Sequence, residues 1–497
     1  MRQHYWMRLF EILPGTLVWT TLAGVVVLSF FMPLGVIYFI IVFDLYWLIR
    51  ICYMLIYVLL SWFRLRTTMA VDWYKTLQQT PGDYRQYYHL IFLPTYKEPY
   101  AVVEKPFKAL IDSRFDLRQC IVVLAGEERD REHFLSVADE IRKNYEHHFL
   151  RFIVTVHPKN IPGELPGKGS NTHYAARQAQ KIVDELGLPY ERVIVSNFDI
   201  DTCIHPNYLA LLTHTYMTHP NPTRASYQPV AVYNNNIWES NPIVRVVASS
   251  TTFWLLTDLS RAERLLTFSS HSMSFKALVD VGFWDNTIVT EDSRIFLQCL
   301  VRYDGDYQTV PLYLPVYMNT VDIGELRRSL VNQYKQMRRW AWGVEHFPWM
   351  MRHFWFTDGL GKRVPLKKKL YYLWIQTEGV YSWATAPLII LLAGYLPLWL
   401  ATEAQRATAL FQNAPYMLSS LMQFSMVGLI VTAILYTLML PPRPADRSLL
   451  NYTIMIGQWL LAPLTLIVFG SLPATDAQTR LMLGGKFRLG FWVTEKK

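Results

Sequence analysis

The sequence has little cysteine. Only four cysteines occur in 497 residues, Cys52, Cys120, Cys203 and Cys299, and no two of them form a Cys-x-x-Cys pair. This scarcity argues against a disulfide framework and against a zinc site built from paired cysteines. It is typical of a protein whose soluble part lies in a reducing, cytosolic compartment.

Charged residues are also scarce, at 18% of the chain, whereas hydrophobic residues make up 52% and aromatic residues 15%. Such a composition indicates membrane segments rather than a purely soluble protein. The formal net charge of +9 suits contact with anionic lipid headgroups or with phosphorylated substrates. No motif supports nucleic-acid binding, so we expect a lipid bilayer and no nucleic acid as partners.

Residues 14–63 are almost continuously apolar. We expect one span over Thr16–Met32, a turn at Pro33–Gly35 and a second span ending near Phe63, each long enough for the ~20 residues that a bilayer needs. The second apolar stretch follows without an intervening A-x-A-type site, which argues against a cleaved signal peptide. Basic residues flank both ends and place both on the cytoplasmic side: Arg2, Arg8, Arg64 and Arg66.

Two ionisable residues, Asp44 and Arg50, lie inside the second span. Ionisable groups at such depth usually face a protein interior or a wet path, so this pair could line a conduit. The alternative is that Arg50 snorkels and Asp44 pairs locally.

The chain changes character between Thr67 and Leu360, where short apolar runs alternate with polar, helix-like stretches. The predicted strands are Leu90–Leu93, Cys120–Leu124, Phe152–Val156 and Val193–Asn197, and the predicted helices between them are Val103–Asp112, Glu132–His147 and Thr172–Leu186. This alternation predicts an α/β domain with a mostly parallel, doubly wound sheet.

Two carboxylates, Asp199 and Asp201, directly follow the predicted strand Val193–Asn197. Ligands of open α/β sheets bind beyond the carboxyl ends of strands, and an Asp-x-Asp there can hold a divalent cation together with a pyrophosphate. Taken alone, the pattern is equally compatible with a surface turn.

Two further stretches follow the same logic. Thr95, Tyr96 and Glu98 come directly after the first predicted strand and can hydrogen-bond to and stack on a nucleoside, although proline-rich turns are common there. The run Gly167-Lys168-Gly169 opens a helix, where it either cradles phosphate or forms a plain turn. It lacks the Walker spacing of an ATP-hydrolysing loop.

Two downstream stretches add acid–base and stacking groups. In Thr290-Glu291-Asp292 a carboxylate can take a proton from a hydroxyl, or the stretch can cap the helix Ser293–Val301. Gln336, Arg339 and Trp340 share one face of a helix that begins near Ile323. They suit phosphate and sugar binding, or an interfacial helix at a membrane surface.

Together these motifs resemble those of membrane-embedded family 2 glycosyltransferases, the group of cellulose, chitin and hyaluronan synthases and of ceramide glucosyltransferase. The resemblance covers about residues 90–345, with apolar segments on both sides. It implies a GT-A type domain and a membrane-bound, inverting hexosyltransferase that moves sugar from a nucleotide-sugar, a UDP-sugar, to a growing polysaccharide. The alternative is single transfer to a lipid acceptor.

The resemblance also implies residue roles. Asp292 would be the general base, with Glu291 or Thr290 holding its orientation, and Asp199 and Asp201 would bind Mg²⁺ or Mn²⁺ with the diphosphate. The remaining donor and acceptor contacts would come from Thr95, Tyr96, Glu98, Lys168, Gln336, Arg339 and Trp340. Phe491–Lys496 resembles an F-x-V-T-x-K gating loop, in which Thr494 and Lys496 would contact the nucleotide.

Two departures from the family pattern affect specificity. The base-contacting Asp expected after the second strand is missing, and Glu127 or Glu128 stands near its place. The acceptor loop F-C-G-S is replaced by Phe268-Ser269-Ser270-His271. Donor sugar and acceptor identity therefore do not transfer from the resemblance.

The C-terminal part contains two clear spans, Met417–Leu440 and Leu449–Gly470, and an ambiguous stretch, Leu370–Leu400, interrupted by Glu378 and Pro387. A cytoplasmic, basic tail requires an even number of crossings, so we favour two spans plus an interfacial helix over Leu370–Trp383. The predicted order is a helix pair at 1–66, a cytoplasmic GT-A domain at 67–360, interfacial and membrane helices at 361–472 and a tail at 473–497. We expect a multi-pass protein of the cell membrane.

Overall fold

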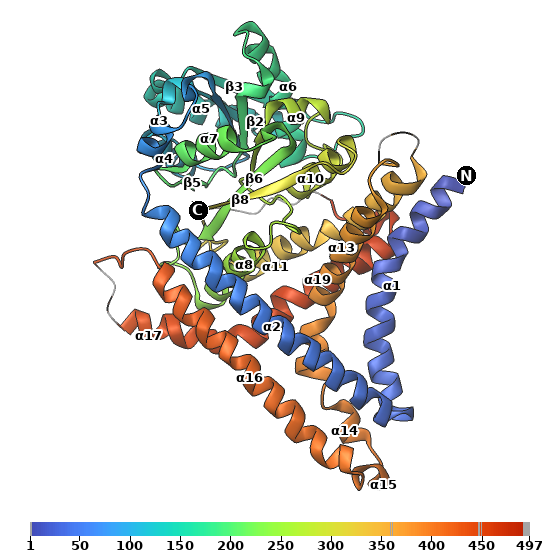
Figure 1. The fold of residues 1–497 in the computed structure, drawn as a ribbon. Coiled ribbons are helices and arrows are strands. Elements are labelled where there is room, and N and C mark those ends of the chain that lie inside the picture. Colours follow the sequence, from blue (N-terminus) through green and yellow to red (C-terminus); the bar gives the residue numbers. More distant parts are fainter. Residues whose placement is uncertain (1, 358, 360, 446–447, 449, 491–497) are drawn as a thin grey trace.

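The computed structural model describes residues 2–357, 359, 361–445, 448 and 450–490. A sheet domain forms one end of the molecule, and long helices from both ends of the chain extend away from it (Figure 1). The chain enters through α1 (Arg2–Phe31) and α2 (Pro33–Met69). Only Met32 separates these helices, so the turn expected at Pro33–Gly35 is wrong: Pro33 begins α2, where its missing N–H costs nothing.

Eight strands form one sheet in the order β3-β2-β1-β4-β7-β6-β8-β5. The first four in this order pair in parallel, and β7 then pairs antiparallel with β4 and β6. The predicted strands are all present, as β1 (Tyr88–Pro94), β2 (Cys120–Glu127), β3 (Arg151–His157) and β4 (Val193–Asn197). The others are β5 (Cys203–Ile204), β6 (Ala225–Tyr233), β7 (Ser272–Ser274) and β8 (Gln308–Met318).

Side chains alternate between the two faces of the central strands, as the pleat requires. Ile91 and Leu93 of β1 pack on one face and Leu90 and Phe92 on the other. The first face is covered by α4 (Tyr100–Ile111), α5 (Arg131–Tyr145) and α7 (Tyr208–Thr218), and the second by α6 (Lys168–Glu185), α9 (Phe275–Asp280) and α10 (Glu291–Arg302). This two-sided covering confirms the predicted α/β fold.

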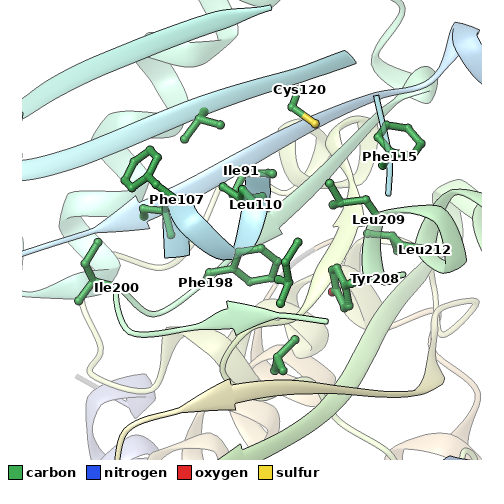
Figure 2. Close-up of a cluster of buried hydrophobic side chains, with 14 of the residues drawn as sticks. Ile91, Phe107, Leu110, Phe115, Cys120, Phe198, Ile200, Tyr208, Leu209 and Leu212 are labelled. Carbon is green, nitrogen blue, oxygen red and sulfur yellow. The ribbon is translucent and has the colours of Figure 1, made fainter. Parts of the chain in front are cut away.

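The first core reaches the end of β4. Phe198 and Ile200 both point into it, near Phe107 and Tyr208 (Figure 2). Both side chains are almost completely buried. Because these two residues anchor the chain just beyond β4, the alternating Asp199 is directed away from the core.

Four helical segments among the described residues are long and apolar enough to cross a membrane: Tyr5–Phe31, Pro33–Met69, Ala409–Met439 and Leu450–Leu483. The third is α16 (Ala409–Met439), and the fourth contains α17 (Leu450–Gly457), α18 (Ala462–Thr465) and α19 (Leu472–Leu483). The ambiguous stretch forms α13 (Leu366–Leu388), a five-residue π-helical turn and α14 (Leu396–Leu400).

Two helices connect the sheet to these long segments. α8 (Pro242–Leu259) packs on β6 and on α2, and α11 (Leu326–Ala341) packs on α19. Ser61 of α2 donates to the Leu256 carbonyl and lies 2.7 Å from the Ser260 hydroxyl. The sheet edge that carries the motifs is thereby held against the apolar helices.

Within α2, Arg50 forms an ion pair with Glu378 of α13 and a 2.9 Å hydrogen bond to the Tyr46 hydroxyl. Arg50 is thus paired with a carboxylate of another helix. Asp44 is buried and its Oδ1 has no hydrogen-bond partner.

Candidate active site

The four residues of the carboxylate cluster are Lys168, Asp199, Glu291 and Asp292. Lys168 Nζ lies 2.7 Å from Asp199 Oδ1 and 3.0 Å from both carboxylate oxygens of Asp292. Glu291 Oε1 is 3.9 Å from the same nitrogen. Residues more than 120 positions apart in sequence thus converge on one ammonium group.

The backbone around Lys168 explains how this convergence is possible. Gly167, which precedes α6, has a φ of 148°, a left-handed value that favours glycine. At Gly169 an added Cβ would lie 3.3 Å from Glu291 Cβ and 3.0 Å from the Asp285 carbonyl oxygen. A side chain there would push α6 away from the start of α10, and the cluster would open.

Burial governs the protonation of the cluster. Burial and then the neighbouring Asp292 charge raise the pKa of Glu291 to about 8, against the opposing charges of Lys168 and Arg339. Burial opposes the charge of Lys168, but Asp199, Asp292 and Glu291 raise its pKa above the ordinary value. Lys168 therefore stays charged at neutral pH, whereas Glu291 keeps a proton over most of that range.

Asp292 and Glu291 begin α10, and Thr290 is the residue at the N-cap. Thr290 makes no side-chain cap hydrogen bond, and its Oγ1 is buried without a partner. Asp292 Oδ1 instead accepts from Asn197 Nδ2 at 3.3 Å. No hydrogen bond joins the described Asp292 carboxylate to Glu291 or Thr290, which were expected to orient it. Lys168 and Asn197 donate to this carboxylate instead.

Three further residues support the cluster, and the motifs did not assign them a role. Ser269 Oγ donates to Asp199 Oδ2 at 2.7 Å, and Thr267 Oγ1 donates to the Asp292 carbonyl oxygen at 2.6 Å. His271 is fully buried, 3.9 Å from Asp292, and burial lowers its pKa. The loop that departs from the F-C-G-S pattern thus contacts Asp199 through Ser269 and Asp292 through His271.

The predicted nucleoside contacts gather at the ends of β1 and β2. Glu98 Oε2 accepts from Thr95 Oγ1 at 2.7 Å and from the Tyr96 N–H. Glu127 is buried and paired with Arg129, whose guanidinium lies 4.6 Å from the centre of the Tyr96 ring. Of the two glutamates proposed to replace the family's Asp, Glu127 therefore faces this group, and Glu128 accepts from the Lys159 N–H instead.

Asp201, the second carboxylate after β4, is buried and accepts from the Asn319 N–H at 3.1 Å. In the described part of the chain no group of three or more His, Cys, Asp or Glu side chains is arranged to hold a metal ion. Mg²⁺ is often held by one or two carboxylates with substrate phosphates completing its shell. The charges of Asp199 and Asp201 both act on the Tyr233 hydroxyl, so the two predicted ligands lie near each other, and their oxygens suit a hard cation.

The α11 motif contacts the ends of β6 and β8. Gln336 and Trp340 line a small cavity with Tyr233, at the end of β6, and Asn319, at the end of β8. The Tyr233 and Trp340 ring centres are 6.1 Å apart. Burial and the charges of Asp199, Asp201 and Asp292 raise the pKa of Tyr233, so its hydroxyl remains a donor. No sequence signal pointed to Tyr233.

Arg339 lies near enough to Glu291 for its charge to oppose the rise in the pKa of that carboxyl. The structure therefore brings Lys168, Asp199, Glu291, Asp292 and Arg339 together, with the Thr95 and Glu127 groups at the neighbouring strand ends. Thr494 and Lys496, the predicted gating-loop contacts, lie outside the described residues.

Comparison with known proteins gives one family. The family model described as glycosyl transferase family group 2 matches residues 194–469, more than half of the chain. This range contains the end of β4, the carboxylates of α10 and the α11 motif. No curated protein sequence matches the chain.

Similar solved structures include the mannosyltransferase PcManGT from Pyrobaculum calidifontis in complex with GDP-Man and Mn²⁺. It is 15% identical with a TM-score of 0.40, and the match covers 78% of this chain and 99% of that one. S. aureus TarS 1–349 is 13% identical with a TM-score of 0.34, over 70% of this chain and 90% of its own. TarS 1–349 in complex with UDP-GlcNAc is 16% identical with a TM-score of 0.31, over 69% and 90%.

Proposed function

The chain belongs to glycosyl transferase family group 2, and from that membership we propose that it is a membrane-bound, inverting enzyme that extends a polysaccharide. It is a glycosyltransferase with a GT-A type domain, and it takes sugar from a nucleotide-sugar donor. The proposal adds the acceptor, the stereochemistry, the membrane location and the use of a UDP-sugar.

The observation that carries the choice of acceptor is the grouping of Tyr233, Gln336 and Trp340 around a cavity of about 10 Å³. The cavity itself has room for only one water molecule, so we propose that a saccharide lies at its rim. A flat indole beside hydroxyl and amide donors suits a sugar ring, which presents an apolar face and polar edges. The cavity lies next to the carboxylate cluster, because Tyr233 is within the electrostatic reach of Asp199 and Asp292. A saccharide end held there would direct a hydroxyl toward Asp292.

In this mechanism Asp292 accepts the proton of the acceptor hydroxyl, and the acceptor oxygen attacks the anomeric carbon in line with the departing nucleoside diphosphate. Lys168 and Arg339 meet the negative charge that develops on the leaving group. A single displacement inverts the anomeric configuration. Asp199 and Asp201 would hold Mg²⁺ or Mn²⁺, which supplies further charge neutralisation to the diphosphate when bound.

Donor recognition uses the strand ends on the opposite side of Lys168. Tyr96, stacked by Arg129, offers an aromatic face for the base, and the Glu127 carboxylate offers an acceptor for a base N–H. Thr95 and Glu98 hold the turn that carries Tyr96.

Product sizing tests the acceptor. Membranes containing the full chain would be incubated with a panel of radiolabelled UDP-sugars and Mg²⁺ or Mn²⁺, and products separated by gel and mass spectrometry. We expect a ladder of saccharides that lengthens with time. A single glycolipid would instead establish transfer to a lipid acceptor, the second outcome that the motifs allow, and would overturn polysaccharide extension.

A further inference from the structure

A second group of buried charges lies between α8 and α2, outside the site described above. Arg261 and Arg264, here the arginine pair, follow the end of α8, with side chains 13% and 11% exposed. The Nε atoms of both are buried and have no hydrogen-bond partner. A buried guanidinium N–H without a partner is costly, so two of them side by side indicate a missing acceptor.

The nearby acidic groups do not supply that acceptor. Asp258 Oδ1 is 3.8 Å from Arg264 Nε, beyond hydrogen-bonding distance. Glu263 Oε1 is also 3.8 Å from Arg261 Nε, and its side chain is 62% exposed. Glu378 of α13 is already paired with Arg50 of α2. Burial and the neighbouring Arg264 charge lower the pKa of Arg261, as expected for two cations with too little negative charge between them.

Aromatic rings pack around the arginine pair. The Arg261 guanidinium carbon lies 4.6 Å from the centre of the Tyr53 ring and 5.8 Å from that of Tyr57, both on α2. The charges of Arg261 and Arg264 also act on the Tyr371 hydroxyl of α13. The Arg261 guanidinium is therefore packed against α2, and Tyr371 of α13 lies within reach of both arginine charges.

Exposed apolar side chains lie near the arginine pair on both α2 and α13. Ile56 and Leu60 lie on the same face of α2 as Tyr53 and Tyr57, and both are exposed. Leu370 and Trp374 are exposed on α13, one turn apart. Basic residues mark the nearby ends of these two helices, Arg64 and Arg66 on α2 and Lys367–Lys369 on α13. A polar anion site next to lipid-facing apolar side chains has the pattern of a headgroup site.

We propose that the arginine pair binds the phosphate of an anionic membrane lipid, whose acyl chains lie along the exposed apolar faces of α2 and α13. The guanidinium forks of Arg261 and Arg264 suit phosphate oxygens, which would accept from the unpartnered Nε–H groups. This site does not depend on the proposed sugar transfer.

The segment that carries the arginine pair continues into the active site. Thr267, three residues after Arg264, donates to the Asp292 carbonyl oxygen, and Ser269 donates to Asp199. Three extended residues span at most ~10 Å, so a lipid phosphate on Arg264 would fix the start of the segment that orients both carboxylates.

Photo-crosslinking to the wild-type chain tests the site without relying on a variant. The full-length protein in zwitterionic vesicles would receive a small fraction of phosphatidylglycerol with a photoactivatable headgroup, and labelled peptides would be mapped by mass spectrometry. We expect labels on 53–57 and 260–264. Labels confined to other segments would overturn the proposal. Displacement of the label by millimolar glycerol 3-phosphate would assign the site to a soluble phosphate ester and overturn the lipid assignment.

Native mass spectrometry of delipidated protein gives the affinity. Phosphatidylglycerol should bind about tenfold more tightly than phosphatidylcholine, and R261Q/R264Q should lose that preference. The control R363Q removes an arginine whose side chain is 81% exposed, and it should behave as wild type. R261K/R264K keeps the charge but loses the forked donors, so it should fall between the two. Equal lipid preference in all four proteins would contradict the proposal.

Discussion

The carboxylate cluster and the arginine pair are both groups of buried charge, and they are unbalanced in opposite directions. Lys168 is the cation in direct contact with Asp199, Glu291 and Asp292, whereas Arg261 and Arg264 lie near one buried carboxylate, Asp258. Buried charge is stable only when it is neutralised. The first group is thus suited to receive cations, and the second an anion.

The two groups also differ in how they reduce their imbalance. In the carboxylate cluster, Glu291 keeps a proton because burial and Asp292 raise its pKa to about 8. An arginine cannot release its proton in this way, because its pKa stays far above neutral. An excess of buried carboxylates can thus be neutralised when one of them binds a proton, whereas an excess of buried arginines requires an external anion.

The largest expected effect comes from removing the base of the carboxylate cluster. D292N should lower the rate of sugar transfer about a thousandfold, because the carboxylate that accepts the proton of the acceptor hydroxyl is lost. The asparagine carboxamide has nearly the same size as the aspartate side chain, so packing is kept. Release of nucleoside diphosphate measures the rate. The matched control is D306N, at a side chain 73% exposed on the same domain, which should be unaffected. Full activity of D292N would show that Asp292 is not the general base.

A balanced buried pair provides the reference for both groups. Arg50 and Glu378 are paired, so R50L should destabilise the protein by about 3 kcal/mol because the buried Glu378 loses its cation and keeps only the Tyr46 and Ser382 hydroxyls as donors. Thermal unfolding in detergent measures this. The double variant R50L/E378L should recover most of the loss. If the double variant is as unstable as the sum of the single ones, the pair does not act as a unit.

The stored proton predicts a pH dependence. Between pH 4.5 and about 8 the unfolded Glu291 carboxylate is ionised while the folded one is protonated. The folded state therefore binds more protons, and stability falls as pH rises, by up to about 1.4 kcal/mol per pH unit. E291Q should flatten this slope in denaturant unfolding. The control E263Q, at an exposed carboxylate, should retain the wild-type slope.

The smallest effect belongs to the loop that supports Asp199. S269A removes one hydrogen bond to the carboxylate, worth about 1 kcal/mol, so activity should fall about fivefold. In a titration of activity with Mn²⁺, S269A should need a higher Mn²⁺ concentration for half-maximal activity, because Asp199 would bind the ion less tightly. S113A, at a serine bonded to the Pro206 carbonyl on another surface, is the control. An unchanged Mn²⁺ titration would show that Ser269 does not position Asp199.

The parallel half of the sheet and the acidic motifs follow from the sequence because their signals are local. Val193–Asn197 is a short apolar run, and Asp199 must come at its carboxyl end. β7 is only three residues, Ser272–Ser274, and has no apolar pattern, so its antiparallel place between β4 and β6 could not be predicted. Contacts across the chain, such as Tyr233 with Trp340 or Arg50 with Glu378, arise from packing that no local pattern records.

The stereochemistry of the first product tests the central claim most directly, that Asp292 activates the acceptor for a single displacement beside Lys168. Proton NMR of the reaction with an α-linked UDP-sugar would follow the anomeric signal of the newly added residue from the first turnovers. The account predicts a β-linked product. An α-linked product would require a second displacement or a different attacking face, and would contradict it.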